Sequence, residues 1–153
     1  MKFYWESEVF PHIDGKNILY ESVLPKEALH QRYGNAKALL FPIHWEEPFG
    51  LVMIEAMACG TPVIAYNRGS VSEIVRDGVT GYIVDDDRSN KSDKTNTSNL
   101  IIKKKGIAGL VEAIKRIGEI DRSACRKHVE AHFTVDRMVT GYEQVYKKVL
   151  GEQ

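Results

Sequence analysis

The sequence has few of the features that mark several large classes of protein. It contains two cysteines among 153 residues, and Lys plus Arg equals Asp plus Glu at 21 each. Because no cluster of metal ligands surrounds either cysteine, we expect reduced thiols and no metal site. The balanced charge argues against a nucleic-acid binder, which usually carries a basic surplus. No segment approaches the roughly 20 apolar residues of a membrane span, and the acidic start is unlike a signal peptide. We therefore expect a cytoplasmic protein.

Short apolar runs alternate with helical segments through the first half of the chain. Strands are expected at Asn17–Tyr20, Ala38–Ile43, Val63–Tyr66 and Gly81–Val84, with helices at 25–35, 51–59 and 70–76. Apolar runs of this length are typical of strands buried on both faces of a parallel sheet. Strand, helix and strand in this order predict right-handed βαβ units. The expected fold class is α/β: a single domain over residues 1–153 with a three-layer, Rossmann-like, doubly wound parallel sheet.

The second half of the chain is polar first and helical afterwards. Residues 85–99 include no apolar side chain, so we expect a flexible polar insertion over residues 85–104. Asp121 and Thr134 are the expected N-caps of two further helices. The last of these helices carries an apolar stripe from Val135 to Val149.

Glu55 is the first residue that points to chemistry. It is the only charged residue between Phe49 and Cys59, in a helix that is apolar all round, so we expect it to be buried. A buried carboxylate is costly unless a partner pairs with it. Two explanations are open: a structural ion pair or cap, or hydrogen bonds from the hydroxyl groups of a ligand.

Glu47 precedes the same helix, separated from it by a turn that contains Pro48 and Gly50. Gly50 permits close approach of a ligand, and the free N–H groups at the start of the helix suit a phosphate. In a doubly wound sheet this turn lies at the carboxyl end of a strand, where ligands bind. An anion site between two carboxylates suits a ligand with phosphate and polyol parts, such as a sugar nucleotide. We expect Trp45 to pack around this loop, with stacking on a sugar or base as the alternative.

The whole segment closely resembles the Glu-x7-Glu motif of the glycosyl transferases group 1, which are retaining glycosyltransferases of the GT-B fold. The resemblance runs from Leu24 to Val84. It includes Glu47-Pro48-Phe49-Gly50-Leu51, Glu55-Ala56-Met57-Ala58-Cys59-Gly60-Thr61-Pro62, Arg68-Gly69-Ser70 and Asp77-Gly78-Val79-Thr80-Gly81-Tyr82. The segment 126–146 resembles the closing helices of the family.

The resemblance implies a donor-binding set of Glu47, Phe49, Gly50, Leu51, Val52 and Glu55. Within it, Glu47 is the catalytic residue that contacts the transferred sugar, and the amides of Phe49 and Gly50 meet the sugar hydroxyls. The first two amides of the helix meet the diphosphate, and Glu55 holds the ribose hydroxyls. Such enzymes use no cofactor beyond the nucleoside-diphosphate sugar and no bound metal. They stabilise a departing nucleoside diphosphate and an oxocarbenium-like transition state.

Two parts of the family pattern have no counterpart here. The Gly-Arg-Leu strand end with its downstream Lys, which clamp the diphosphate, is absent from residues 1–43, as is an acceptor-binding domain. Lys16, Lys26 and Arg68 are interpreted as solvated surface charges. We therefore expect an N-terminally truncated domain that needs a missing domain or partner chain. Its sheet is expected to rearrange into four strands or to associate through an exposed edge as a homo-oligomer.

Three functions are open at this stage. The chain is the donor-binding part of a hexosyl-transferring glycosyltransferase with an unknown acceptor, inactive without its N-terminal part. Alternatively, it is a subunit of a split glycosyltransferase, or a non-catalytic nucleotide-sugar-binding module. Intact Glu47, Gly50 and Glu55 favour the first two functions over the third.

Overall fold

The computed structural model describes residues 2–88 and 99–151, with a parallel β-sheet at the centre. The strands are β1 (Leu39–Phe41), β2 (Val63–Tyr66) and β3 (Gly81–Val84), in the order β1-β2-β3. Leu39 pairs with Val63, and Val63 pairs with Gly81. The last three expected strands are confirmed, and with them the parallel, Rossmann-like arrangement.

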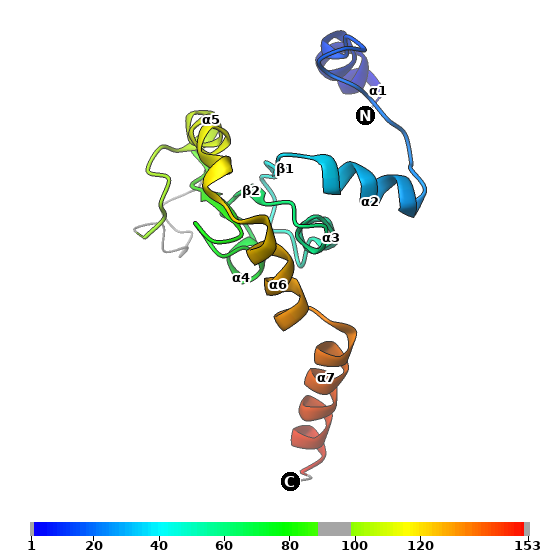
Figure 1. Cartoon of the computed structure of the whole chain (residues 1–153), viewed down its shortest axis with the longest axis vertical. Coiled ribbons are helices and arrows are strands. Elements are labelled where there is room, and N and C mark those ends of the chain that lie inside the picture. The colour runs from blue at the N-terminus through cyan, green and yellow to red at the C-terminus, as the bar shows by residue number, and fades with distance from the viewer. Residues whose placement is uncertain (1, 89–98, 152–153) are drawn as a thin grey trace.

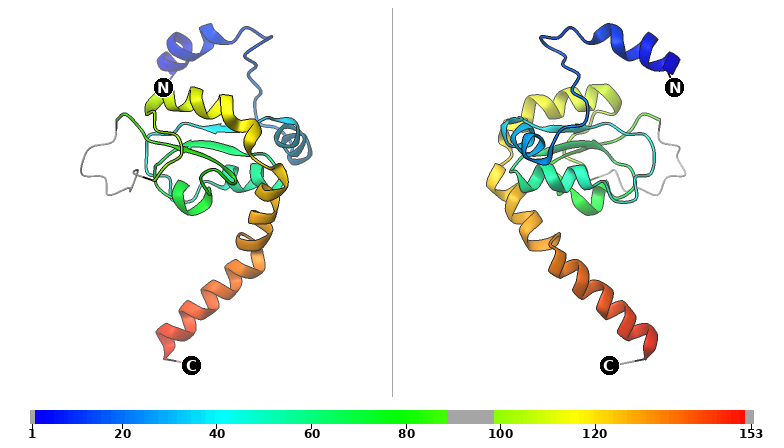
Figure 2. Two further views of the ribbon diagram at one scale, coloured as in Figure 1. Left: turned by 60° about the vertical axis from the view of Figure 1, so that its left-hand side comes forward. Right: turned by 90° about the vertical axis from the view of Figure 1, so that its right-hand side faces the viewer.

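Helices cover both faces of this sheet. The described residues form the helices α1 (Lys2–Tyr4), α2 (Lys26–Asn35), α3 (Leu51–Ala58), α4 (Val71–Ile74), α5 (Gly106–Arg116), α6 (Arg122–His132) and α7 (Val135–Leu150), with single turns of π-helix at Trp5–Val9 and of 3₁₀-helix at Phe10–His12 and Ile117–Glu119. Helices α3 and α4 lie on one face and α5 on the other, so the sheet is the middle of three layers (Figures 1 and 2). Helix α6 packs alongside α3.

The core is made by the sheet and by the apolar faces turned toward it. Every residue of β2 and β3 is buried. Met53 and Met57 of α3 and Leu110 of α5 pack in the same cluster, together with Cys125 of α6. Each fully buried aliphatic side chain of this kind contributes about 1.5–3 kcal/mol. This burial fixes α3, and therefore the turn that precedes it, relative to the carboxyl ends of the strands.

The segment 17–20 does not form the expected strand. The carboxylate of Asp14 accepts hydrogen bonds from the amides of Lys16, Asn17 and Ile18 at 2.9, 2.7 and 2.8 Å. These bonds, the one from Ile18 foremost, hold the pKa of Asp14 below its ordinary value. Amides that are bonded to a nearby carboxylate cannot join a ladder. The four-strand sheet is therefore not formed, and within the described residues β1 pairs with β2 alone.

The polar segment is shorter than the sequence suggested. Asp85 and Asp86, at its start, are buried. Leu100 and Ile102, near its end, belong to the core cluster. Both ends of the predicted insertion are therefore part of the packed domain, and residues 89–98 lie outside the described residues.

The two expected helix caps are confirmed. Asp121 accepts a hydrogen bond of 2.8 Å from the amide of Ser123, and Thr134 accepts one of 3.3 Å from the amide of Arg137. Helix α7 extends away from the sheet (Figures 1 and 2), and no residue of it is buried. Among the described helices none combines the length and the apolar content that crossing a membrane requires.

Candidate functional site

The turn between β1 and α3 depends on the backbone of Gly50. This residue has φ 76° and ψ 63°, in the left-handed region, and directly precedes the helix. A Cβ atom at Gly50 would lie 2.6 Å from the terminal methyl carbon of Met53. The left-handed conformation favours glycine, and any other side chain would also have to displace the end of the Met53 side chain. The turn therefore brings the chain tightly from the carboxyl end of β1 into the first turn of α3.

Glu47 closes this turn with its side chain. One carboxylate oxygen accepts a hydrogen bond of 3.1 Å from the amide of Gly50, and the other accepts one of 3.0 Å from the indole nitrogen of Trp45. Trp45 is 61% exposed, so the expected packing around the loop is wrong. The indole instead contacts the loop through its N–H group, because the short chain between the two residues brings them together at the surface.

The first amides of α3 are available to a ligand. The first hydrogen bond near the start of the helix joins the amide of Met53 to the carbonyl of Gly50 at 3.0 Å. Within the described residues, the amides of Phe49, Leu51 and Val52 donate to no other group. The amide of Gly50 is bound to Glu47. Two adjacent free amides at the positive end of a helix favour an anion.

Glu55 is exposed, which contradicts the expectation that it is buried. Helix α3 buries Met53, Ala56 and Met57, whereas Leu51 on the opposite side is also exposed. Because residues four apart share one helical face, Leu51 and Glu55 lie together on this outer face. The apolar composition of the helix suggested complete burial, but the neighbouring elements cover only one side of it.

Tyr33 of α2 is the neighbour of Glu55. Burial raises the pKa of Tyr33, and the charge of Glu55 and a hydrogen bond to it raise that pKa further. The phenol of Tyr33 therefore lies near the Glu55 carboxylate. A partner of this kind fits the structural explanation of Glu55, and it leaves acceptor positions on the carboxylate for a ligand.

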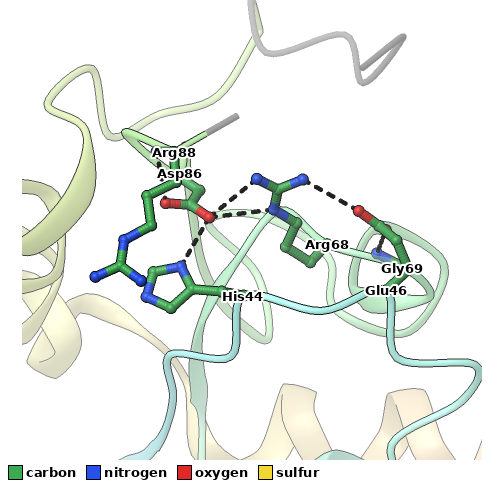
Figure 3. A network of polar contacts seen from close by, with 6 residues as sticks. All are labelled: His44, Glu46, Arg68, Gly69, Asp86 and Arg88. Atoms are coloured by element: carbon green, nitrogen blue, oxygen red, sulfur yellow. Dashed lines mark hydrogen bonds and ion pairs between the residues drawn. The ribbon is translucent and has the colours of Figure 1, made fainter. Parts of the chain in front are cut away.

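A charged network joins the three loops that follow the strands (Figure 3). Asp86, which follows β3, is 1% exposed and accepts hydrogen bonds from Nε and Nη2 of Arg68 at 3.2 and 3.1 Å. Nδ1 of His44, after β1, lies 2.9 Å from the same carboxylate. On the other side, Nη1 of Arg68 donates to Glu46 at 3.1 Å. The interpretation of Arg68 as a solvated charge is wrong, because it is only 9% exposed and pairs with two carboxylates.

The pKa of Asp86 reflects these contacts. Burial by itself would raise it, but the hydrogen bonds from His44, from the amide of Arg88 and from Arg68 outweigh burial and lower it to about 2. Asp86 therefore carries its charge at neutral pH. Lys16 and Lys26, by contrast, are exposed as expected.

His44 and Asp86 escaped the sequence analysis, although one signal points to them. Each lies a few residues after an apolar strand, as Glu47 does. The carboxyl ends of parallel strands share one edge of the sheet, so polar side chains there are candidates for contact. Because residues 85–104 are expected from sequence to form an insertion, the sequence does not place Asp86 beside the other strand ends.

An open cavity of about 440 Å³ borders the site on its other side. Phe49 and Leu51 form one wall, and Phe133 and Met138, where α6 passes into α7, form the other. The rings of Phe49 and Phe133 meet edge to face with centroids 6.4 Å apart. A mostly apolar cavity does not suit a diphosphate. Among the described residues no cluster of His, Cys, Asp or Glu could hold a metal ion.

The family assignment follows from a match that spans these loops. The family model described as "Glycosyl transferases group 1" matches residues 15–105, which is more than half of the chain. The chain belongs to the group 1 glycosyltransferases. The matched range contains the Glu47 turn and Glu55, and also Arg68 and Asp86, so the whole strand-end network lies within the family's region.

Two proteins illustrate the range of sequence similarity to this chain. An uncharacterised 41.2 kDa protein from the cps region of Klebsiella pneumoniae is 31% identical over 140 residues, which cover 92% of this chain and 35% of that protein. A D-inositol 3-phosphate glycosyltransferase of Actinosynnema mirum is 53% identical over 57 residues, covering 37% of this chain and 13% of that protein.

The solved structures include a similar fold. The sucrose-phosphate synthase of Thermosynechococcus elongatus superposes with a TM-score of 0.68 at 27% identity, over 98% of this chain and 34% of that one. The chain thus spans about a third of the length of the relatives that it matches along most of its own length.

Proposed function

We propose that this chain binds a nucleoside-diphosphate sugar at the turn between β1 and α3 and supplies the donor half of a retaining hexosyl transfer. The observation that carries the proposal is the pair of free amides of Leu51 and Val52, placed between the carboxylates of Glu47 and Glu55. An anion held by backbone amides and flanked by acceptors for hydroxyl groups matches the two halves of a sugar nucleotide.

The diphosphate would lie at the start of α3. Each hydrogen bond from an amide to a charged oxygen contributes about 1.5–3 kcal/mol, and the helix dipole adds attraction for the negative charge. The same groups would stabilise the charge that develops on the leaving nucleoside diphosphate. The proposed transfer therefore involves no metal ion and no cofactor besides the donor.

The two carboxylates would bind the two polyol parts. Glu55 lies on the open face of α3, one turn beyond the amides, and would accept hydrogen bonds from the ribose. Glu47 would face the transferred sugar as the catalytic residue. A carboxylate offers about four acceptor positions, and Glu47 uses one for Gly50 and one for Trp45. Positions thus remain for sugar hydroxyls, alongside the amide of Phe49.

The acceptor would be held by a part that this chain does not contain, as a further domain or as a partner chain. The support for this view is that the relatives are about three times as long as the matched segment. A subunit of a split glycosyltransferase would show the same site. A non-catalytic module would also bind the donor, but it would transfer nothing when the acceptor-binding part is supplied.

Calorimetric titration of the full chain with UDP, GDP and ADP tests donor binding. At least one nucleoside diphosphate should bind, and Glu55→Gln should weaken that binding about tenfold, the effect of one lost hydrogen bond to a charged group. Glu143→Gln, an exposed change in the middle of α7, is the matched control and should bind like the wild type. Equal affinity of Glu55→Gln and wild type would contradict the proposal.

A further inference from the structure

The network in Figure 3 extends from the core to the residue next to Glu47. Its inner end is Asp86, which is almost fully buried and holds Nε and Nη2 of Arg68. Its outer end is Glu46, which is largely exposed and accepts a hydrogen bond from Nη1 of the same arginine. The other oxygen of Glu46 accepts a hydrogen bond from the amide of Gly69. Arg68 therefore links a buried anchor to the loop that carries the candidate site.

Two further bonds tie that loop to the segment after β2. The amide of Ser70 donates a hydrogen bond to the carbonyl of Glu47 at 2.9 Å. The hydroxyl of Ser70 donates one to the carbonyl of Phe49 at 2.8 Å. The residues assigned to the sugar are thus held by the segment that Arg68 begins. Helix α3 is held separately, by the burial of Met53 and Met57 in the core.

We propose that Arg68 is a positioning residue for the sugar end of the donor site: it fixes the loop that contains Glu46, Glu47 and Phe49 against the buried carboxylate of Asp86. This inference rests on the proposed function. Arginine is required because three of its nitrogens act at once in a planar fork, whereas the ammonium group of lysine is a point charge. The nucleotide end, formed by the first amides of α3 and by Glu55, does not depend on the fork.

Because the sugar end and the nucleotide end of the site depend on different contacts, two binding affinities distinguish a positioning role of Arg68 from a role in folding. Disturbing the fork displaces the groups that face the sugar, and leaves those that face the nucleotide. The affinity for a nucleotide sugar should therefore fall relative to the affinity for the matching nucleoside diphosphate. If Arg68 acted in folding alone, its substitution would reduce the fraction of folded protein and would lower both apparent affinities together.

Calorimetry with matched pairs, UDP with UDP-glucose, GDP with GDP-mannose and ADP with ADP-glucose, measures this difference in the full chain. Glu46→Gln keeps the Arg68–Asp86 pair. Arg68 and Gly69 donate to different oxygens of Glu46, and the amide nitrogen that replaces one of them cannot accept a hydrogen bond, so one of the two bonds is lost as arranged. Arg68→Lys removes the fork directly. Each variant should weaken binding of the nucleotide sugar about tenfold and leave binding of the nucleoside diphosphate unchanged. Glu130→Gln, which removes an equally exposed carboxylate from α6, should change neither.

The outcomes separate this inference from the function on which it rests. If wild type binds no nucleoside diphosphate and no nucleotide sugar, the proposed function is wrong and this inference is wrong with it. If wild type binds both ligands and Glu46→Gln changes neither affinity, or lowers both equally, the positioning role alone is overturned. Glu46→Gln tests the positioning role even if Arg68→Lys does not fold. The side chain of Glu46 lies at the exposed end of the network, so its replacement should leave the fold intact.

Discussion

Gly69 lies against the main chain of Glu47 so closely that a Cβ atom at Gly69 would stand 2.2 Å from the Glu47 carbonyl oxygen. The same atom would lie 2.5 Å from the Glu47 nitrogen, and Gly69 has φ +51°. A side chain at this position is excluded by the contact and disfavoured by the conformation. At Gly69, the loop after β2 therefore contacts the candidate site through its backbone.

We expect Gly69→Ala to destabilise the domain by about 1–3 kcal/mol, because neither backbone segment can move without breaking the hydrogen bonds around it. Urea unfolding followed by circular dichroism measures the change. Gly141→Ala is the matched control. A Cβ at Gly141 meets nothing within 4 Å and lies within α7, so this change should stabilise by about 0.5–1 kcal/mol. Wild-type stability of Gly69→Ala would show that the contact is looser than described.

Because Asp86 is buried and charged, we expect the free energy of unfolding to depend on pH in the acid range. Its pKa is lowered from 3.8 to about 2 in the folded protein, so its charge stabilises the fold above pH 4, and this contribution is lost as the pH falls toward 2. We expect Asp86→Asn to lose stability at neutral pH by about 3–5 kcal/mol, because Arg68 is left without its buried partner. Between pH 4 and 2, the variant should lose less stability than the wild type. An equal loss of stability by the wild type and Asp86→Asn between pH 4 and 2, measured by urea unfolding, would contradict the lowered pKa of Asp86.

The two thiols should differ in reactivity. Cys125 is fully buried, and burial raises the pKa of its thiol to about 11, whereas Cys59 is partly exposed. Because the thiolate is the reactive form, we expect a colorimetric disulfide reagent at pH 8 to label one thiol in the native chain and both in urea. Cys59→Ser should leave no reactive thiol in the native state. Rapid labelling of both thiols without denaturant would contradict the burial of Cys125.

Sequence reasoning was reliable where a segment's structure depends on its own pattern. The strands expected at Ala38–Ile43, Val63–Tyr66 and Gly81–Val84 are confirmed as three parallel strands, the first of which is shorter than expected and ends at Phe41. The caps Asp121 and Thr134 are also confirmed, because a cap acts within its own first turn. The resemblance to the group 1 family rested on local motifs as well, and the family match confirms it.

Prediction failed where distant residues decide the outcome. Glu55 was expected to be buried from the composition of α3, but exposure depends on which faces other elements cover. Arg68 was interpreted as a surface charge because its partner, Asp86, follows a different strand. The error at residues 17–20 was instead local: the turn around Asp14 competes with strand pairing. The roles of Glu47 and Glu55 toward a donor remain predictions.

The order of the strands has a consequence for how the protein is made. Each strand pairs with its neighbour in the sequence, so β1, α3 and β2 can assemble as soon as they leave the ribosome. In the part of the chain that the structure describes, α5, which begins at Gly106, packs on the face of β2 and β3 opposite α3. A nascent chain that pauses before this helix therefore presents one uncovered apolar face of the sheet. We expect the chain to be more prone to aggregation during this interval of synthesis than after α5 has packed.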